Sequence, residues 1–158
     1  MALQPGQKAP DFTLFSSDKK PVSLTDYSGK NLVMLFFPMA FTGTCTTELC
    51  EVRDNITTYA RLNADVVGIS VDSPFALAKY KEEQALPFPL LSDFNKEVST
   101  EYGSLYETFA MGMKGVSKRS AFVIDSQGVI QYTEVLENAG EIPNFTAIQE
   151  ALSVAGGK

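Results

Sequence analysis

The chain has 158 residues and a mass of 17.2 kDa, with 13 basic and 19 acidic residues and a formal net charge of −6. This length predicts a single domain over residues 1–158, large enough to bury its own hydrophobic core. The sequence contains no histidine, which excludes Ser-His-Asp and Cys-His catalytic sites and histidine-ligated metal centres. We therefore expect neither a metal ion nor another cofactor.

The charge balance and the first residues of the chain allow predictions about the binding partners and the cellular location of the protein. An acidic surface disfavours binding to nucleic acid and to anionic lipid. No apolar run approaches the roughly 20 residues that span a bilayer, so no membrane contact is expected. Residues 1–6 lack the basic and apolar stretches of a signal peptide. We expect a cytoplasmic protein, in which two cysteines are either buried and inert or redox-active.

The first half of the chain alternates buried strands with helices. Polar and apolar residues alternate over 11–15, which predicts a strand that forms an N-terminal hairpin with residues 22–24. The continuous apolar run 32–37 predicts a strand buried on both faces. Apolar residues at three- and four-residue spacing predict a helix over 44–61.

The second half continues this alternation, while residues 103–118 give no clear pattern. The glycine-rich tail 156–158 is expected to fray. Strands are predicted at 65–71, 88–91, 120–125 and 129–133, and helices at 74–84, 95–101 and 143–154.

This order implies an α/β fold with a parallel central sheet and an antiparallel edge. A βαβ unit followed by ββα, with a cysteine at the start of the helix after the first buried strand, is the thioredoxin-like layout. We therefore predict a mixed central sheet flanked by helices, with a β-hairpin at the N-terminus.

Cys45 stands where the first buried strand gives way to a helix. Ligands bind at this edge of open α/β sheets. If Thr42 is the helix N-cap, Cys45 is the third helical residue, near unpaired N–H groups and the positive end of the helix dipole, which favour a thiolate. The alternative is an inert core cysteine, but the surrounding threonines argue against it.

Several segments of the sequence resemble the peroxiredoxins, thiol peroxidases of the thioredoxin superfamily. The spacing Pro38-x-x-x-Thr42-x-x-Cys45 is similar to the PxxxTxxC signature of this family. The resemblance covers nearly the whole chain. Its other parts are residues 6–12, residues 88–93 and the strand that bears Arg119.

The resemblance assigns a role to each residue of the candidate site. It implies that Cys45 is the peroxidatic cysteine, with Thr42 and Arg119 as its partners, that Pro38 shields the site, and that Glu48 orients the arginine. The position of Arg119 agrees with its implied pairing, because Arg119 begins a buried strand where an unpaired charge is costly. The alternatives are an ordinary salt bridge for Arg119 and a solvated helix position for Glu48.

The resemblance implies reduction of hydrogen peroxide and organic hydroperoxides through a sulfenic acid on Cys45. The spacing Cys45-x4-Cys50 resembles the bacterioferritin-comigratory (PrxQ) subgroup, in which the second cysteine resolves the first. Residues 88–93 and 121–125 are more similar to the AhpE subgroup, which often uses one cysteine. A disulfide within one helix requires unwinding of its first turns, because five helical residues advance about 7.5 Å.

Several alternatives concern partners and function. Reduction would come from a thioredoxin-like protein or another external thiol, and a homodimer formed around the active-site loop is compatible with the surface. A thiol–disulfide oxidoreductase would need Cys-x-x-Cys, which is absent. A non-enzymatic redox-sensing module remains the alternative to a peroxidase.

Overall fold

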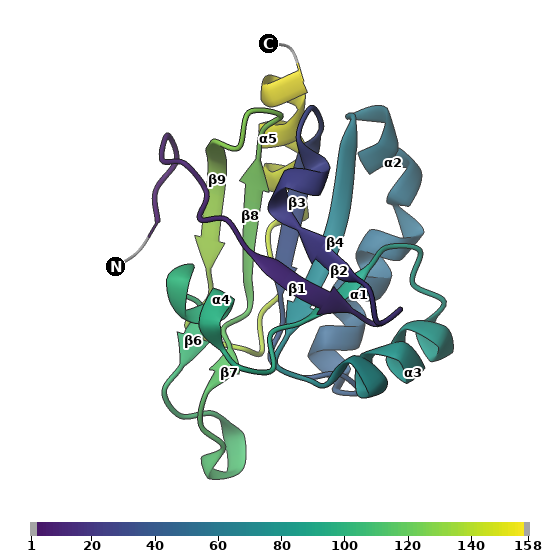
Figure 1. Ribbon diagram of the computed structural model, residues 1–158, viewed down its shortest axis with the longest axis vertical. Helices are drawn as coiled ribbons and strands as arrows, with labels where there is room; N and C mark the ends of the chain where they lie inside the picture. Colours follow the sequence, from purple (N-terminus) through teal and green to yellow (C-terminus); the bar gives the residue numbers. More distant parts are fainter. Residues whose placement is uncertain (1–2, 157–158) are drawn as a thin grey trace.

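The computed structural model describes residues 3–156. Of the tail 156–158 that is predicted to fray, Gly156 ends the last helix, and residues 157 and 158 lie outside the described residues. Figure 1 shows a central sheet with helices packed around it. The strands are β1 (Thr13–Ser16), β2 (Pro21–Ser23), β3 (Asn31–Phe36), β4 (Ala64–Ser70), β5 (Leu90–Ser92), β6 (Leu105–Tyr106), β7 (Val116–Ser117), β8 (Ser120–Ile124) and β9 (Ile130–Val135). The helices are α1 (Gly43–Asp54), α2 (Ile56–Arg61), α3 (Pro74–Gln84), α4 (Glu97–Glu101) and α5 (Phe145–Gly156), with 3₁₀ turns at Leu24–Tyr27 and Ala110–Gly112.

The main sheet has seven strands in the order β2-β1-β5-β4-β3-β8-β9. Strands β3, β4 and β5 run parallel, while β8 pairs with β3 and β9 pairs with β8 in antiparallel register. The β1–β2 hairpin adds to the other edge through β5. The mixed sheet and the N-terminal hairpin are as predicted.

Strand β3 lies inside the sheet, between β4 and β8, and is buried along its whole length. Because successive side chains point to opposite faces, Val33 and Leu35 join the core beneath α1, α3 and α5, whereas Met34 and Phe36 join a second core on the face that carries α4. This explains the continuous apolar run in the sequence. The end of β3 is therefore a rigid support for whatever follows it.

Gly68 of β4 makes room for the segment that leaves β3. A Cβ atom at this position would lie 2.7 Å from Leu90 and 3.2 Å from Phe37. The Phe37 N–H donates to the Ile69 carbonyl, so the chain stays bound to β4 for one residue beyond β3. A larger residue at 68 would push this segment away from the sheet.

The helix predicted over 44–61 is wrong in one respect, because it is two helices that meet at Asn55. The Asn55 side chain donates to the carbonyl of Glu51, which is the acceptor that the Asn55 backbone N–H would use in a continuous helix. That N–H donates to Val52 instead. An asparagine that competes for helix hydrogen bonds in this way ends α1.

The remaining differences are shifts of boundaries. The stretch 103–118 contains the short hairpin of β6 and β7. The strand predicted at 88–91 lies at 90–92, the helix predicted at 95–101 begins at Glu97, and the last helix begins at Phe145 rather than at Pro143. Prolines at 87 and 89 have no N–H to donate to a strand, and the Asn144 side chain caps the last helix by accepting from the Ala147 N–H.

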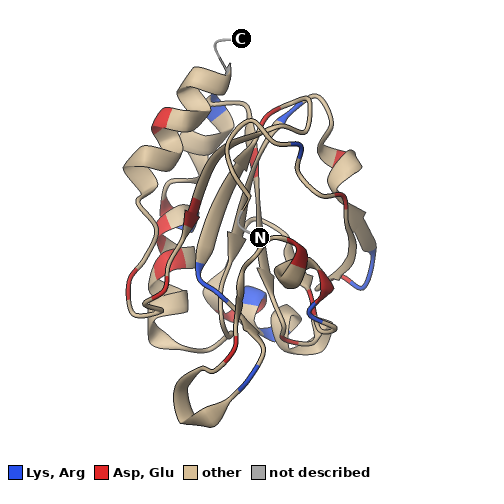
Figure 2. Ribbon diagram, turned by 90° about the vertical axis from the view of Figure 1, so that its left-hand side faces the viewer, with Lys and Arg blue, Asp and Glu red and all other residues tan. Residues whose placement is uncertain are grey.

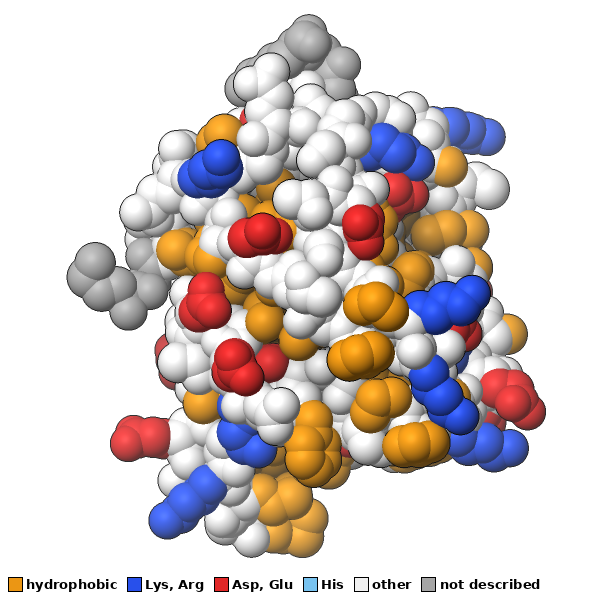
Figure 3. All heavy atoms as spheres, in the orientation of Figure 1, with side chains coloured by type: hydrophobic (Ala, Val, Ile, Leu, Met, Phe, Trp, Pro, Cys, Tyr) orange, Lys and Arg blue, Asp and Glu red, His pale blue; other side chains and the backbone are white. Residues whose placement is uncertain are grey.

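The surface is polar and mixed in charge. Figure 2 shows acidic and basic residues interspersed over the elements, and Figure 3 shows hydrophobic side chains emerging in the region of the β1–β2 hairpin. Phe15 of that hairpin is 56% exposed. Within residues 3–156, no helix is both long and apolar enough to cross a membrane.

Candidate active site

The turn from β3 into α1 places Cys45 as predicted. Thr42 is the N-cap residue and Gly43 the first residue of α1, so Cys45 is the third helical residue, and it is 1% exposed. The Thr42 hydroxyl does not cap the helix but donates to the Met39 carbonyl at 2.7 Å. The N–H groups of the first turn therefore lack a side-chain cap and are available close to the Cys45 sulfur.

Asp72 holds the loop before α1 in place, and the sequence analysis missed it. Its Oδ2 accepts from the backbone N–H of Ala40 at 2.8 Å and from the Ser70 hydroxyl at 2.6 Å. The Asp72 carbonyl accepts from the Ser92 hydroxyl, which ties the ends of β4 and β5 together. The available signal was the position of Asp72 just after a buried strand, at the same sheet edge as Cys45.

An aromatic pair supports the same loop from α3. Phe41 has a left-handed backbone with φ of 66°, which a bulky residue rarely adopts, and its ring centroid lies 5.0 Å from that of Tyr80. The Tyr80 and Thr46 hydroxyls are hydrogen-bonded at 2.9 Å. Burial raises the pKa of Tyr80 to about 12, so its hydroxyl stays neutral at physiological pH. These contacts fix the direction in which the loop enters α1.

Arg119 brings three acceptors together just before β8. Its Nη2 donates to the Cys45 sulfur at 3.3 Å, its Nη1 to Glu48 Oε1 at 2.7 Å, and its Nε to the Ala139 carbonyl at 3.0 Å. Arg119 is only 2% exposed. The guanidinium is thus held on both sides, with one N–H edge directed at the thiol. The role of Ala139 could not be read from the sequence, because it uses a backbone carbonyl.

Glu48 is fully buried in the helix that carries Cys45. Burial raises the pKa of its carboxyl from 4.5 to about 7, against the opposing effect of Arg119 and with a smaller contribution from the charge of Glu134. Its second oxygen, Oε2, has no hydrogen-bond partner among the described residues. The solvated helix position that was considered for Glu48 is therefore wrong.

Pro38 and Cys50 flank this cluster. Pro38 is buried directly after β3 and precedes the active-site loop. Cys50 is half-buried on α1, and its thiol makes a long hydrogen bond of 3.6 Å to Gln84 at the end of α3. Both cysteines are free. The structure therefore brings Cys45, Glu48 and Arg119 into direct contact, while Cys50 is in contact with α3.

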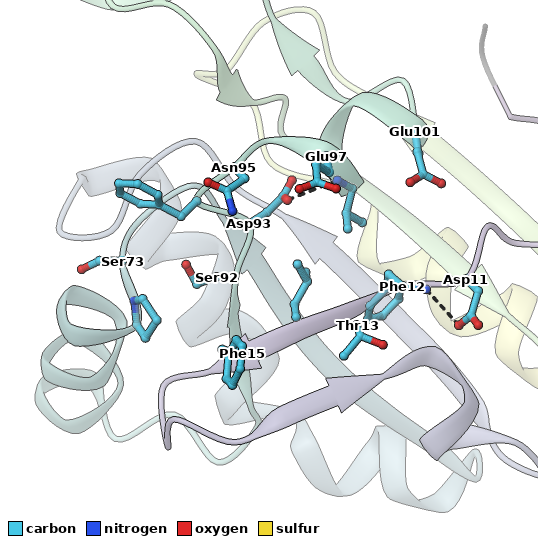
Figure 4. Close-up of a pocket in the computed structure, with 14 residues that line it drawn as sticks. Asp11, Phe12, Thr13, Phe15, Ser73, Ser92, Asp93, Asn95, Glu97 and Glu101 are labelled. Carbon is cyan, nitrogen blue, oxygen red and sulfur yellow. Dashed lines mark hydrogen bonds between the residues drawn. The ribbon is translucent and has the colours of Figure 1, made fainter.

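A separate hollow lies away from these residues. It has a volume of about 660 Å³ and is bounded by β1, by the start of α3 and by α4, with Phe15, Asp93 and Glu101 in its wall. Figure 4 shows its polar side chains, which include Ser73 and Asn95. None of the six predicted site residues lines it. Within residues 3–156, no cluster of three or more cysteine and acidic side chains is arranged to hold a metal ion.

The geometry is suited to nucleophilic attack by sulfur. A buried cysteine at a helix N-terminus, with a guanidinium N–H at 3.3 Å, is placed to react as a thiolate. The guanidinium N–H and the N–H groups of the first helical turn lie close to the Cys45 sulfur, and such donors can stabilise negative charge that develops on a second atom.

Comparisons with known proteins agree with this chemistry. Residues 5–133 match the AhpC/TSA family. A Mycobacterium tuberculosis protein whose name assigns it to the peroxiredoxins is 45% identical over 130 residues, 81% of this chain and 82% of that protein. Peroxiredoxin Bcp of Bacillus subtilis is 38% identical over 130 residues, 81% of this chain and 82% of the relative. The crystal structure of peroxidoxin BcpB from M. tuberculosis has a TM-score of 0.81 at 28% identity and covers 97% of this chain and 96% of that one. The chain therefore belongs to the AhpC/TSA family of peroxiredoxins and is a thiol-dependent peroxidase with a thioredoxin-like fold.

Proposed function

We propose that Cys45 is the peroxidatic cysteine and that residues 1–158 form one domain that reduces hydrogen peroxide and organic hydroperoxides. The observation that carries this proposal is the contact of 3.3 Å between Arg119 Nη2 and the Cys45 sulfur at the start of α1. The thiolate attacks one peroxide oxygen and the O–O bond breaks. Cys45 then carries a sulfenic acid, and the other oxygen leaves as hydroxide or alkoxide and takes up a proton.

The remaining residues act on the leaving oxygen or on each other. Ionisation of a thiol cannot supply the whole rate, because its nucleophilicity falls as its basicity falls. Arg119, the Thr42 hydroxyl and the N–H groups of Thr44 and Cys45 are the donors that would stabilise charge on the departing oxygen. Glu48 would hold the guanidinium in place.

Pro38 would keep water away from the sulfur. It is buried between the end of β3 and the loop that carries Thr42, which is the place that this role requires. Exclusion of water strengthens every electrostatic interaction inside the site. The ring also lacks an N–H, so Pro38 adds no unpaired donor to the buried wall.

We propose that Cys50 resolves the sulfenic acid by forming a disulfide with Cys45. Five residues along a helix advance about 7.5 Å, beyond the roughly 7 Å limit between Cα atoms for a disulfide. The first turns of α1 must therefore unwind. Cys50 is half-buried and its thiol makes one long hydrogen bond to Gln84, which supports its availability once these turns unwind. The alternative is a one-cysteine enzyme that is recycled by an external thiol.

A thioredoxin-like protein or another thiol would return the enzyme to its reduced form. A disulfide between Cys45 and Cys50 closes a very short loop, so it restricts the unfolded chain little and is readily reduced. A second copy of the chain would be another partner, in a homodimer that forms around the active-site loop. Phe41 in that loop and Phe75 at the start of α3 each expose more than half of their surface, which supports such an interface.

Intact-protein mass after one equivalent of hydrogen peroxide tests these proposals. One added oxygen on the Cys50→Ser protein, none on the Cys45→Ser protein, and a loss of two hydrogens in the wild type are expected. An oxygen that persists on wild-type Cys45, with Cys50 still open to alkylation, would establish the one-cysteine alternative. Turnover with a thiol reductant separates an enzyme from a redox sensor, which would react once only.

A further inference from the structure

Two buried acidic groups share one buried cation in this site. Arg119 donates to Glu48 Oε1 at 2.7 Å and to the Cys45 sulfur at 3.3 Å, and its third contact is the neutral carbonyl of Ala139. Glu48 is 0%, Cys45 1% and Arg119 2% exposed. If thiolate and carboxylate were both charged, the cluster would hold one net negative charge out of reach of water, which is costly.

The groups that surround Glu48 do not offset a second negative charge. From β9 the charge of Glu134 raises the pKa of Glu48, and from α3 the neutral Tyr80 hydroxyl faces the cluster. Arg119 is the cation that faces Glu48, and Cys45 stands one turn away on the same helix. Burial raises the pKa of Glu48 to about 7 even with the guanidinium present. Its Oε2 has no hydrogen-bond partner within the described residues, so no donor is in place there to stabilise a charged oxygen.

We propose that Glu48 carries a proton while Cys45 is a thiolate, and that it releases this proton when Cys45 becomes a sulfenic acid. This inference rests on the proposed role of Cys45. Oxidation turns the charged sulfur into a neutral group, so the positive charge of Arg119 is left without an anion. Glu48 then ionises to replace it, because one buried cation favours one buried anion at a time.

The proton released by Glu48 balances the reaction. The thiolate takes an OH group from ROOH with two of its own electrons, and the O–O bond breaks to leave RO⁻. The carboxyl proton passes to RO⁻, through the site or through water, and gives ROH. The sum is thiolate, peroxide and carboxylic acid on one side, and sulfenic acid, alcohol and carboxylate on the other. Reduction of the sulfenic acid by thiols restores the thiolate, and Glu48 takes its proton back.

Release of a proton differs from orientation of Arg119, and the Glu48→Gln variant distinguishes these two roles of Glu48. A glutamine keeps a side-chain oxygen that accepts from Arg119, but it holds no acidic proton. Proton uptake is measured with an indicator dye in weakly buffered solution, as one equivalent of hydrogen peroxide oxidises a Cys50→Ser protein. This background stops the reaction at the sulfenic acid. Glu51→Gln, an exposed carboxyl on the same helix, is the matched control.

Below pH 7 the Cys50→Ser protein and its Glu51→Gln control are expected to take up no net proton. The Glu48→Gln protein should take up about one proton for each sulfenic acid formed. Above pH 7 the three proteins should converge on about one proton, because Glu48 is then ionised before oxidation. Equal uptake with and without Glu48 below pH 7 would overturn the proposal.

Infrared difference spectra of the same oxidation provide a direct readout that does not depend on the glutamine variant folding. The C=O stretch of a protonated carboxyl should disappear on oxidation below pH 7, and it should be absent from both states of Glu48→Gln. A band that persists after oxidation would refute proton release. The mass of the same sample shows whether Cys45 gained oxygen, so a failure of the proposed peroxidatic role appears separately, as no added oxygen.

Discussion

The two cysteines of α1 lie in opposite kinds of environment. Cys45 is in the first turn, sealed from solvent and held by Arg119 at 3.3 Å, within a cluster that also fixes Glu48. Cys50 is half-buried, free, and bonded only weakly to Gln84. The sulfur in the first turn of α1 is held by a buried guanidinium, whereas the Cys50 sulfur makes one long contact with α3. The difference separates a position built for attack from one whose thiol is held by a single weak contact.

The strongest test of this comparison removes each sulfur in turn. Cys45→Ser should abolish peroxide consumption, because a serine hydroxyl is not ionised under these conditions. Cys50→Ser should still consume about one equivalent per chain, since the proposed attack does not use it. Stopped-flow measurement of peroxide loss checks both. Substantial consumption by the Cys45 variant would move the chemistry to another residue.

The next test compares the two arginines near these cysteines. Arg119→Met should slow oxidation of Cys45 by about 10²-fold or more, the usual effect of losing a donor that stabilises transition-state charge. Arg53→Met is the control, because Arg53 lies one turn after Cys50 and binds the Gln84 carbonyl rather than Cys45. Rates are compared with the thiolate fraction, followed by ultraviolet absorbance. If the oxidation rate falls only as much as the thiolate fraction, Arg119 acts only by favouring ionisation of Cys45.

The third test removes the Asp72 contacts that hold the loop before Cys45, and its expected effect on the oxidation rate is smaller. Asp72→Ala leaves the Ala40 N–H and the Ser70 hydroxyl without their acceptor, which costs about 1–3 kcal/mol for each buried group left unpaired. Oxidation should slow less than in Arg119→Met, because the loop shifts Thr42 but leaves Arg119 in place. Urea unfolding and oxidation rates measure the two effects. Asp18→Ala, at an exposed turn, is the control, and equal behaviour of the two variants would show that Asp72 does not support the site.

The sequence predicted the parts of this site that depend on spacing along the chain. Thr42, Cys45 and Glu48 share one helix start, so their relation follows from helix geometry once the start is known. The contact with Arg119 came from a family resemblance, because 74 residues separate it from Cys45. Asp72 and the Ala139 carbonyl could not be predicted, since their roles depend on how β4 and the segment after β9 pack against α1. The break at Asn55 depends on one side-chain hydrogen bond that outweighs the helical pattern.

The last prediction concerns the pH dependence of stability at the Cys45 end of α1. Burial raises the pKa of Glu48 from 4.5 in a free chain to about 7 in the folded protein. The folded state therefore binds more protons than the unfolded state between these values, and stability falls as pH rises through this window.

Glu48→Gln has no such proton, so the reduced wild type should lose stability relative to this variant from about pH 4.5 to 7. Above pH 7 the difference in stability between the two proteins should stay constant. Glu51→Gln should show no such trend, because its carboxyl is exposed. Urea midpoints of the three proteins across this range provide the measurement. Parallel curves for wild type and Glu48→Gln would mean that Glu48 is ionised throughout, and the contrast between the surroundings of Cys45 and Cys50 would then rest on Arg119 alone.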